Sequence, residues 1–264
     1  MEEPIKVSTN QEEHTMRIKF TDTFKIGTSI KDIEVPKELM KRHLTGIDWV
    51  DAALGGEGFT PSMVTMFSGE PGAGKTTSML SMASGLTQNG SICLFNTVEE
   101  SLFQVKRTVN RLQLPGNFLT GSETNVDDII AGADKIRSLP ANKGKPFFLM
   151  IDSLQCLDDG HFSTGRITCH TAERSLEKLT EWAKENFTNV IVVSQVTKGG
   201  QFAGSNKMKH MIDAHLHLGW EKKDKDLMGH RKFEVQKNRF GGTGRTSWMA
   251  MTSKGFEVVA VEET

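Results

Sequence analysis

The segment GEPGAGKTT, at residues 69–77, constrains this chain more than any other feature. Its Gly69, Gly74, Lys75 and Thr76 satisfy the spacing GxxxxGK[ST], between an apolar run of strand length and a run compatible with a helix. The glycines let backbone N–H groups turn toward a phosphate, and the start of the helix adds the positive end of its dipole. The segment therefore predicts a loop that binds the phosphates of ATP.

Each residue of this loop is a candidate ligand, and two of them have distinct roles. Lys75 carries the point charge for the β and γ phosphates, and the Thr76 hydroxyl is a ligand for Mg²⁺. Asp152 ends the apolar run FFLMID, which predicts a second Mg²⁺ ligand at the end of a buried strand. The expected phosphate-binding residues are Gly69, Glu70, Pro71, Gly72, Ala73, Gly74, Lys75, Thr76 and Thr77.

Two acids, Glu99 and Glu100, directly follow the apolar run ICLFN. A hydrolase needs a group that orients or deprotonates water, and either carboxylate suits that task. Acids are also favoured at a solvated turn or at the start of a helix, so position alone leaves both interpretations open.

Apolar runs of strand length alternate with helical segments from Thr45 onward, which predicts an α/β fold with a mainly parallel sheet and helices on both faces. After Gly229 the pattern changes to antiparallel strands. We expect an N-terminal extension at residues 1–44 and one ATPase core at 45–264. The predicted parallel strands are 63–67, 91–96, 147–151, 190–194 and 215–218, the helices 75–87, 102–112, 126–138 and 172–186 with a short one at 36–43, and the antiparallel strands 231–237, 246–252 and 256–261.

The charge balance gives no sign of a general attraction to nucleic acid, because 32 Lys and Arg face 33 Asp and Glu. Three cysteines without a CxxC pair exclude a zinc ribbon or a disulfide framework. The start of the chain lacks the pattern of a signal peptide, and no apolar stretch reaches about 18 residues. We expect a cytoplasmic protein, bacterial or from a phage-infected cell, that makes no membrane contact.

Several motifs in one order resemble the RecA-type ATPase core, and within it most closely the RadA (Sms) family of bacterial DNA repair ATPases. These are TGIDWVDAALGG, GEPGAGKTT, NTVEES, LMIDS, SQVTKGGQFAGSNKMKHMIDAHLHL and KNRFGGTG, and the resemblance covers about residues 44–260. KNRFG, at 237–241, is the most specific of them. Its cysteines and its length do not match the zinc ribbon and the Lon-protease-like domain of that family, so we expect a core-only relative of the kind frequent among phage recombination and annealing proteins.

The resemblance implies roles for four further residues. Glu99 corresponds to the catalytic glutamate, and Gln195 to the residue that senses the γ-phosphate, where RadA usually has His but RecA and DnaB have Gln. Lys237 and Arg239 correspond to fingers that reach the ATP of a neighbouring subunit. Alternate positions on a strand put both cations on one face, although two exposed cations on an edge strand also discourage aggregation.

A Gly-rich, basic segment at 198–210 lies where the resemblance implies a DNA-facing loop, and a second such loop lies at 158–170. Their basic side chains would neutralise phosphates, and the one phenylalanine would stack on a base, so binding would prefer single strands without reading sequence. Flexible basic loops are also ordinary solvated surface. The candidate DNA-binding residues are Arg166, Lys198, Phe202, Lys207 and Lys209.

Together these features predict an ATP- and Mg²⁺-dependent DNA motor or recombinase of the RadA or RecA type. We expect it to hydrolyse ATP between the subunits of a hexameric ring or filament and to act on single-stranded DNA in recombination and repair. A recombinase or a single-strand-binding protein is a further expected partner. The alternatives are the motor of a DnaB-type replicative helicase, and a regulatory ATPase such as a KaiC-like protein or a recombination mediator.

Overall fold

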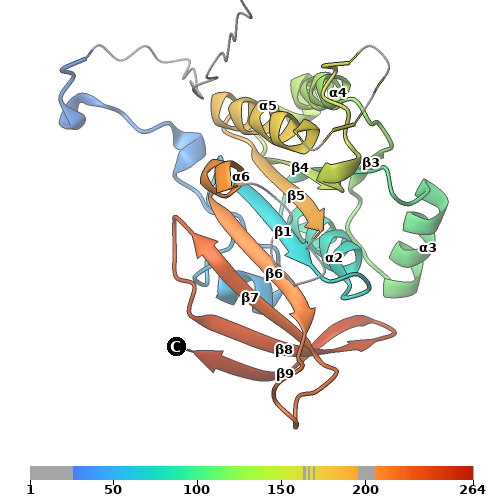
Figure 1. Cartoon of the computed structure of the whole chain (residues 1–264). Coiled ribbons are helices and arrows are strands. Elements are labelled where there is room, and N and C mark those ends of the chain that lie inside the picture. The colour runs from blue at the N-terminus through green and yellow to red at the C-terminus, as the bar shows by residue number, and fades with distance from the viewer. Residues whose placement is uncertain (1–25, 163–164, 166, 169, 196–205, 264) are drawn as a thin grey trace, which may run out of the picture.

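A computed structural model describes residues 26–162, 165, 167–168, 170–195 and 206–263. Within them nine strands form one sheet in the order β3-β2-β4-β5-β1-β6-β7-β8-β9 (Figure 1). The strands are β1 (Val64–Gly69), β2 (Ile92–Thr97), β3 (Leu119–Gly121), β4 (Phe147–Asp152), β5 (Asn189–Gln195), β6 (Ala214–Trp220), β7 (Arg231–Asn238), β8 (Arg245–Thr252) and β9 (Gly255–Glu263).

The first six strands in chain order are parallel, and β7, β8 and β9 add to β6 as antiparallel strands. The expected mixed sheet is thereby confirmed. The helices are α1 (Asp48–Ala53), α2 (Lys75–Gln88), α3 (Leu102–Leu112), α4 (Val126–Ser138), α5 (Thr171–Glu185) and α6 (Asn206–Met211), with 3-10 turns η1 (Ile30–Asp32), η2 (Lys37–Leu39), η3 (Pro140–Asn142) and η4 (Leu154–Cys156).

Helices cover both faces of the central strands, which explains why those strands are apolar throughout. Every residue of β1 and β4 is buried, as expected for strands packed on two sides. Apolar side chains of α1 and α2 form the core on one face, and those of α4, α5 and α6 form the core on the other (Figure 1).

The chain before the core differs from expectation. The helix predicted at 36–43 is only the turn η2, and none of its residues is buried. His43 instead forms a two-way backbone bridge with Phe59, with both N···O distances 2.8 Å. Gly58 is required beside this bridge, because a Cβ there would lie 2.2 Å from the His43 carbonyl oxygen. The backbone of His43, inside the range predicted as a helix, is therefore paired with a distant residue instead.

The direction of each strand decides which residues meet. The parallel strands β1, β2 and β4 all end at one edge of the sheet, which we call the carboxyl edge. Because β7 runs antiparallel to β6, its last residues lie beside the first residues of β6, at the opposite or amino edge.

Candidate functional site

The phosphate-binding loop connects β1 to α2 at the carboxyl edge. Gly74 takes a left-handed conformation (φ 109°) directly before the first turn of α2. The left-handed backbone favours glycine here, and a Cβ would also lie 2.5 Å from the ring of Phe256, which would have to move. Gly72 is also left-handed (φ 72°), but a Cβ there would meet nothing within 4 Å, which leaves the outer side of the loop open.

Lys75 is half-buried within the loop and bonds to its backbone. Its Nζ donates to the carbonyl oxygens of Gly69 and Glu70, at 2.9 and 3.1 Å. Burial lowers the pKa of Lys75, while the nearby charges of Asp152 and Glu99 act in the opposite direction. The ammonium group is thus bound by two neutral carbonyl oxygens of the loop. The phosphate oxygens of a nucleotide can replace these carbonyls as its hydrogen-bond acceptors.

Thr76 and Asp152 meet as the sequence predicted. The Thr76 hydroxyl donates to Asp152 Oδ2 at 2.6 Å. Burial raises the pKa of Asp152 to about 6; the bond from Thr76 lowers it, and the charges of Glu99 and Glu100 raise it further. A carboxylate whose charge is disfavoured in this way gains from a cation beside it.

These side chains fit the Mg²⁺ ion that accompanies ATP in this class of site. A hydroxyl and a carboxylate are hard oxygen donors of the kind Mg²⁺ prefers, and they stand together at the foot of the loop. Binding there would offset the cost of keeping Asp152 ionised.

Glu99, rather than Glu100, faces this centre. Its Oε1 accepts hydrogen bonds from the hydroxyl of Ser153 and, at 3.6 Å, from Cys156 Sγ. The backbone of Glu100 instead bonds back to Thr97 Oγ1, and this residue borders a groove along α3. Ser153 and Cys156 are contacts that the sequence did not indicate, because their only signal is that they follow Asp152.

Lys237 and Arg239 lie at the amino edge, where they cap the end of α6. Lys237 Nζ donates to the carbonyl oxygens of Lys209 and Ile212, at 2.7 and 2.6 Å. Arg239 donates to the His210 carbonyl at 2.8 Å. The β1 strand spans five residue steps between the two edges, roughly 16 Å. Neither cation therefore borders the phosphate-binding loop of its own chain.

Asp213 organises this amino edge, although no sequence pattern singled it out. It is buried, and its carboxylate accepts hydrogen bonds from Val64 N (2.9 Å), Lys184 Nζ (2.5 Å) and Arg239 Nη1 (3.1 Å). Several donors from separate elements thus surround one buried charge, as such a charge requires.

The candidate DNA residues are only partly described. Lys207 and Lys209 are exposed on α6, and Lys207 pairs with Glu173 and Glu177 of α5, at 3.1 and 3.4 Å. Those pairs reduce the free positive charge at this surface. Arg166, Lys198 and Phe202 lie outside the described residues. Gln195 ends β5 at the carboxyl edge, as expected from the sequence.

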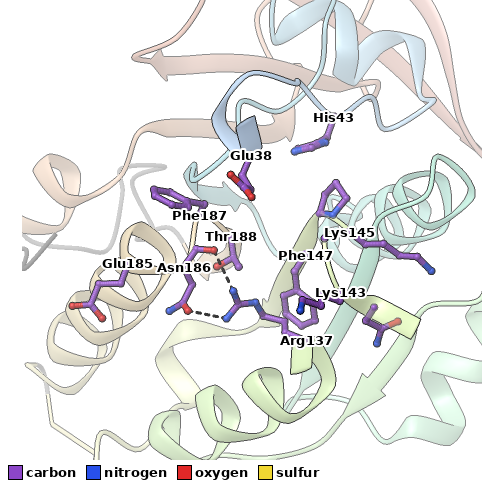
Figure 2. A pocket seen from close by; sticks show the side chains of 13 residues that line it. Glu38, His43, Arg137, Lys143, Lys145, Phe147, Glu185, Asn186, Phe187 and Thr188 are labelled. Carbon is purple, nitrogen blue, oxygen red and sulfur yellow. Dashed lines mark hydrogen bonds between the residues drawn. The ribbon is translucent and has the colours of Figure 1, made fainter. Parts of the chain in front are cut away.

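A cavity of about 460 Å³ opens near the starts of β4 and β5, away from the phosphate-binding loop (Figure 2). Arg137 is its most prominent side chain and points toward Asn186, to whose side-chain and backbone oxygens it donates at 2.9 and 3.2 Å (Figure 2). None of the predicted site residues lines this cavity, and its arginine already serves the protein's own packing.

A phosphate-binding loop, a paired Thr and Asp, and an acid after the neighbouring strand, all at the carboxyl edge of a mainly parallel sheet, define a P-loop ATPase with the RecA fold. The KaiC ATPase family matches residues 43–263, and the chain belongs to this family.

Curated relatives include DNA repair proteins RadA. The chain is 32% identical to that of Aquifex aeolicus over 224 residues, 84% of this chain and 47% of the relative, and 34% identical to that of Rickettsia bellii over 218 residues, 81% and 46%. The chain thus spans about half the length of these relatives. The predicted resemblance to RadA is confirmed.

Solved structures support the fold. A solved ATPase domain matches with a TM-score of 0.65 at 17% identity, over 85% of this chain and 93% of that domain. A DnaB-like replicative helicase matches with a TM-score of 0.62 at 17% identity, over 76% of this chain and 58% of the other. Among the described residues, no helix is long and apolar enough to span a membrane.

Proposed function

We propose that this ATPase acts on single-stranded DNA in recombination or repair and hydrolyses ATP at the contacts between its subunits. The observation that carries the proposal is the meeting of Lys75, Thr76, Asp152 and Glu99 at one open edge, in a chain similar to DNA repair proteins RadA. The remaining roles follow from the chemistry of each group.

Within one subunit, Lys75 exchanges its carbonyl partners for the β and γ phosphates, where its charge stabilises the transferred group. Thr76 and Asp152 would hold Mg²⁺, which would neutralise negative charge on the phosphates. Glu99 orients and deprotonates the attacking water, while the Ser153 hydroxyl fixes its carboxylate. Gln195, at the end of β5, senses the γ-phosphate.

Completion of the site requires a second subunit. Lys237 and Arg239 stand at the amino edge, away from the ATP site of their own chain, and the Arg239 side chain is 47% exposed. If the carboxyl edge of a neighbouring subunit meets this surface, Lys237 and Arg239 of the first subunit lie near the phosphates bound by the second. A ring or a filament satisfies this geometry.

DNA would bind through the segments that follow β4 and β5, of which the second is rich in lysine. Replacing Lys198, Lys207 and Lys209 with Ala should weaken binding to single-stranded DNA and flatten its salt dependence, because fewer counterions are released. Glu173 and Glu177 already neutralise Lys207 in part, so we expect the share of Lys207 to be the smallest of the three. Unchanged affinity and an unchanged salt slope would contradict this assignment.

A regulatory ATPase, whose nucleotide controls assembly rather than movement, is the second candidate, and membership of the KaiC family favours it. Measuring the rate of ATP hydrolysis with and without single-stranded DNA, beside the particle size in each state, separates the two. Hydrolysis that DNA stimulates in a defined oligomer supports the DNA motor. Slow turnover that DNA leaves unchanged, in particles whose size follows the nucleotide, supports the regulatory ATPase.

A further inference from the structure

Glu70 places a carboxylate inside a loop that must accept phosphates. It directly follows Gly69, and its backbone carbonyl accepts a hydrogen bond from Lys75 Nζ at 3.1 Å, so its carboxylate, one side-chain length away, adds a negative charge beside the phosphate-binding loop. A negative charge there disfavours the binding of the negatively charged phosphates. A carboxylate at this position is therefore a cost to nucleotide binding unless another group offsets it.

The side chain of Glu70 anchors the loop to the neighbouring strand. Its Oε1 accepts a hydrogen bond from the backbone N–H of Trp220 at 3.3 Å, and the Glu70 N–H donates to the Leu218 carbonyl at 3.3 Å. The first turn of the loop is thus attached to the end of β6 on both sides of the residue. This attachment explains why a side chain with an acceptor oxygen stands at this position.

Lys222 offsets that charge. Its Nζ lies 2.6 Å from Glu70 Oε2, and this hydrogen bond is the main reason why the pKa of Glu70 falls below its usual range. The side chain of Lys222 is 67% exposed, whereas that of Glu70 is 25% exposed. Such an ion pair contributes little to stability, so its significance lies in the charge that it cancels.

The chain around Lys222 is fixed in place beside the loop. Glu221 is buried, and its carboxylate accepts hydrogen bonds from the backbone N–H groups of Lys222, Lys223 and Asp224, at 2.8 to 3.2 Å, and from Trp248 Nε1 at 2.8 Å. These bonds lower the pKa of Glu221 to about 2. Four donors from the turn and from β8 therefore hold the backbone that carries Lys222.

We propose that Lys222 balances the charge of Glu70 so that the phosphate-binding loop can be anchored to β6 and still accept a nucleotide. Lys222 is then a positioning residue of the ATP site on a turn far along the chain, and it acts through Glu70. The inference rests on the proposed ATP-binding role of the loop.

The two residues should have opposite effects on affinity, which distinguishes charge balance from a merely structural attachment. Lys222→Ala leaves the charge of Glu70 without its partner. The affinity for a fluorescent ATP analogue, measured in the presence of Mg²⁺, should fall by about tenfold. Glu70→Gln keeps the hydrogen bond from Trp220 but removes the charge, so affinity should stay the same or rise. The double variant should resemble Glu70→Gln, since the effect of Lys222 depends on Glu70.

Lys223→Ala is the matched control, because Lys223 is the next residue, is exposed and contacts Glu221 only through its backbone in the bond described above. It should change affinity by less than about twofold. Lys222→Arg should restore most of the affinity, since it restores the charge.

Equal weakening by Glu70→Gln and Lys222→Ala would overturn the inference in favour of a structural attachment, and equal weakening by Lys223→Ala would overturn it in favour of a general charge effect. If the unaltered protein binds no nucleotide, the proposed function fails and this inference with it. If the unaltered protein binds nucleotide, Lys75→Ala abolishes that binding, and Lys222→Ala has no effect, only this inference fails.

Discussion

The two edges of the parallel strands each carry a buried carboxylate, and the surroundings of these two groups differ. At the amino edge, Asp213 is surrounded by Lys184, Arg239 and a backbone N–H. At the carboxyl edge, Asp152 receives a hydrogen bond from the Thr76 hydroxyl, and burial raises its pKa to about 6. One edge is electrostatically complete within the chain, whereas the other gains from a cation. This contrast indicates that the carboxyl edge is the one that gains from a ligand.

The largest expected effect is at the carboxyl edge. Lys75→Ala removes the cation held by the carbonyls of Gly69 and Glu70, so nucleotide-dependent activity should vanish. ATP hydrolysis and nucleotide binding, measured beside circular dichroism to confirm folding, test this prediction. Lys223→Ala should retain full activity as a control. A folded Lys75→Ala variant with the parent rate would refute the assignment of the loop.

The amino edge should matter almost as much, but only through a neighbour. Arg239→Ala should keep nucleotide binding while slowing hydrolysis by up to about 10³ to 10⁵, as for arginine fingers. Mixing Arg239→Ala with Lys75→Ala subunits should restore some turnover, because one kind keeps its phosphate-binding loop and the other keeps its finger. Arg245→Ala, which breaks a surface pair with Glu263, is the matched control.

The contacts of Arg239 with Asp213 and His210 also allow a purely structural role. In that case Arg239→Ala lowers stability, and any loss of hydrolysis stays within its own chain. Mixed oligomers that form but hydrolyse no faster than either variant alone would establish this alternative. The amino edge would then stabilise the fold of its own chain without contributing to hydrolysis in a neighbour.

Within the carboxyl edge, the two neighbouring acids should differ. Glu99 contacts Ser153, whereas Glu100 bonds back to Thr97, so Glu99→Gln should lower turnover by roughly 10² to 10⁴ while ATP still binds. Glu100→Gln should lose much less. Single-turnover hydrolysis of both variants provides the measurement, and the reverse ranking would place the catalytic acid one residue later.

The smallest expected effect is on the pH dependence of stability, and it comes from a histidine in β6. Burial lowers the pKa of His215 to about 4, with further lowering by His217, Lys209 and Lys237 against the opposing charge of Glu234. Its folded-state pKa lies below the unfolded value of 6.5, so as the pH falls from 6.5 toward 4 the unfolded chain binds a proton that the folded chain does not. The free energy of unfolding therefore decreases over this range and is unaffected by His215 above it.

From pH 7.5 to 5, the loss attributable to His215 should be about 2 kcal/mol in the free energy of unfolding. Urea unfolding at both pH values tests this, and His215→Gln should show a flatter pH dependence than the parent. His43, with a pKa also near 4, contributes in the same direction, so some dependence should remain. An equally steep profile in His215→Gln would show that the folded-state pKa of His215 is not lowered.

The cluster at the carboxyl edge was predictable from the sequence, whereas at the amino edge Lys237 and Arg239 were predicted but Asp213 was not. The motif GxxxxGK[ST], the acid that ends FFLMID and the pair after ICLFN are local patterns, and parallel strands necessarily bring their carboxyl ends together. The helix expected at 36–43 was wrong, since the bridge between His43 and Phe59 depends on a partner distant in sequence.

By itself the sequence determined the alternation of strands and helices, the phosphate-binding loop and the acids at the ends of two apolar strands. Each of these follows from periodicity or spacing along the chain. Only the tertiary structure decided that Glu99 bonds to Ser153, that Asp213 holds Arg239, and that Lys222 lies beside Glu70. These contacts join residues up to 152 positions apart. Sheet order and strand direction create them, and neither is encoded in a local pattern.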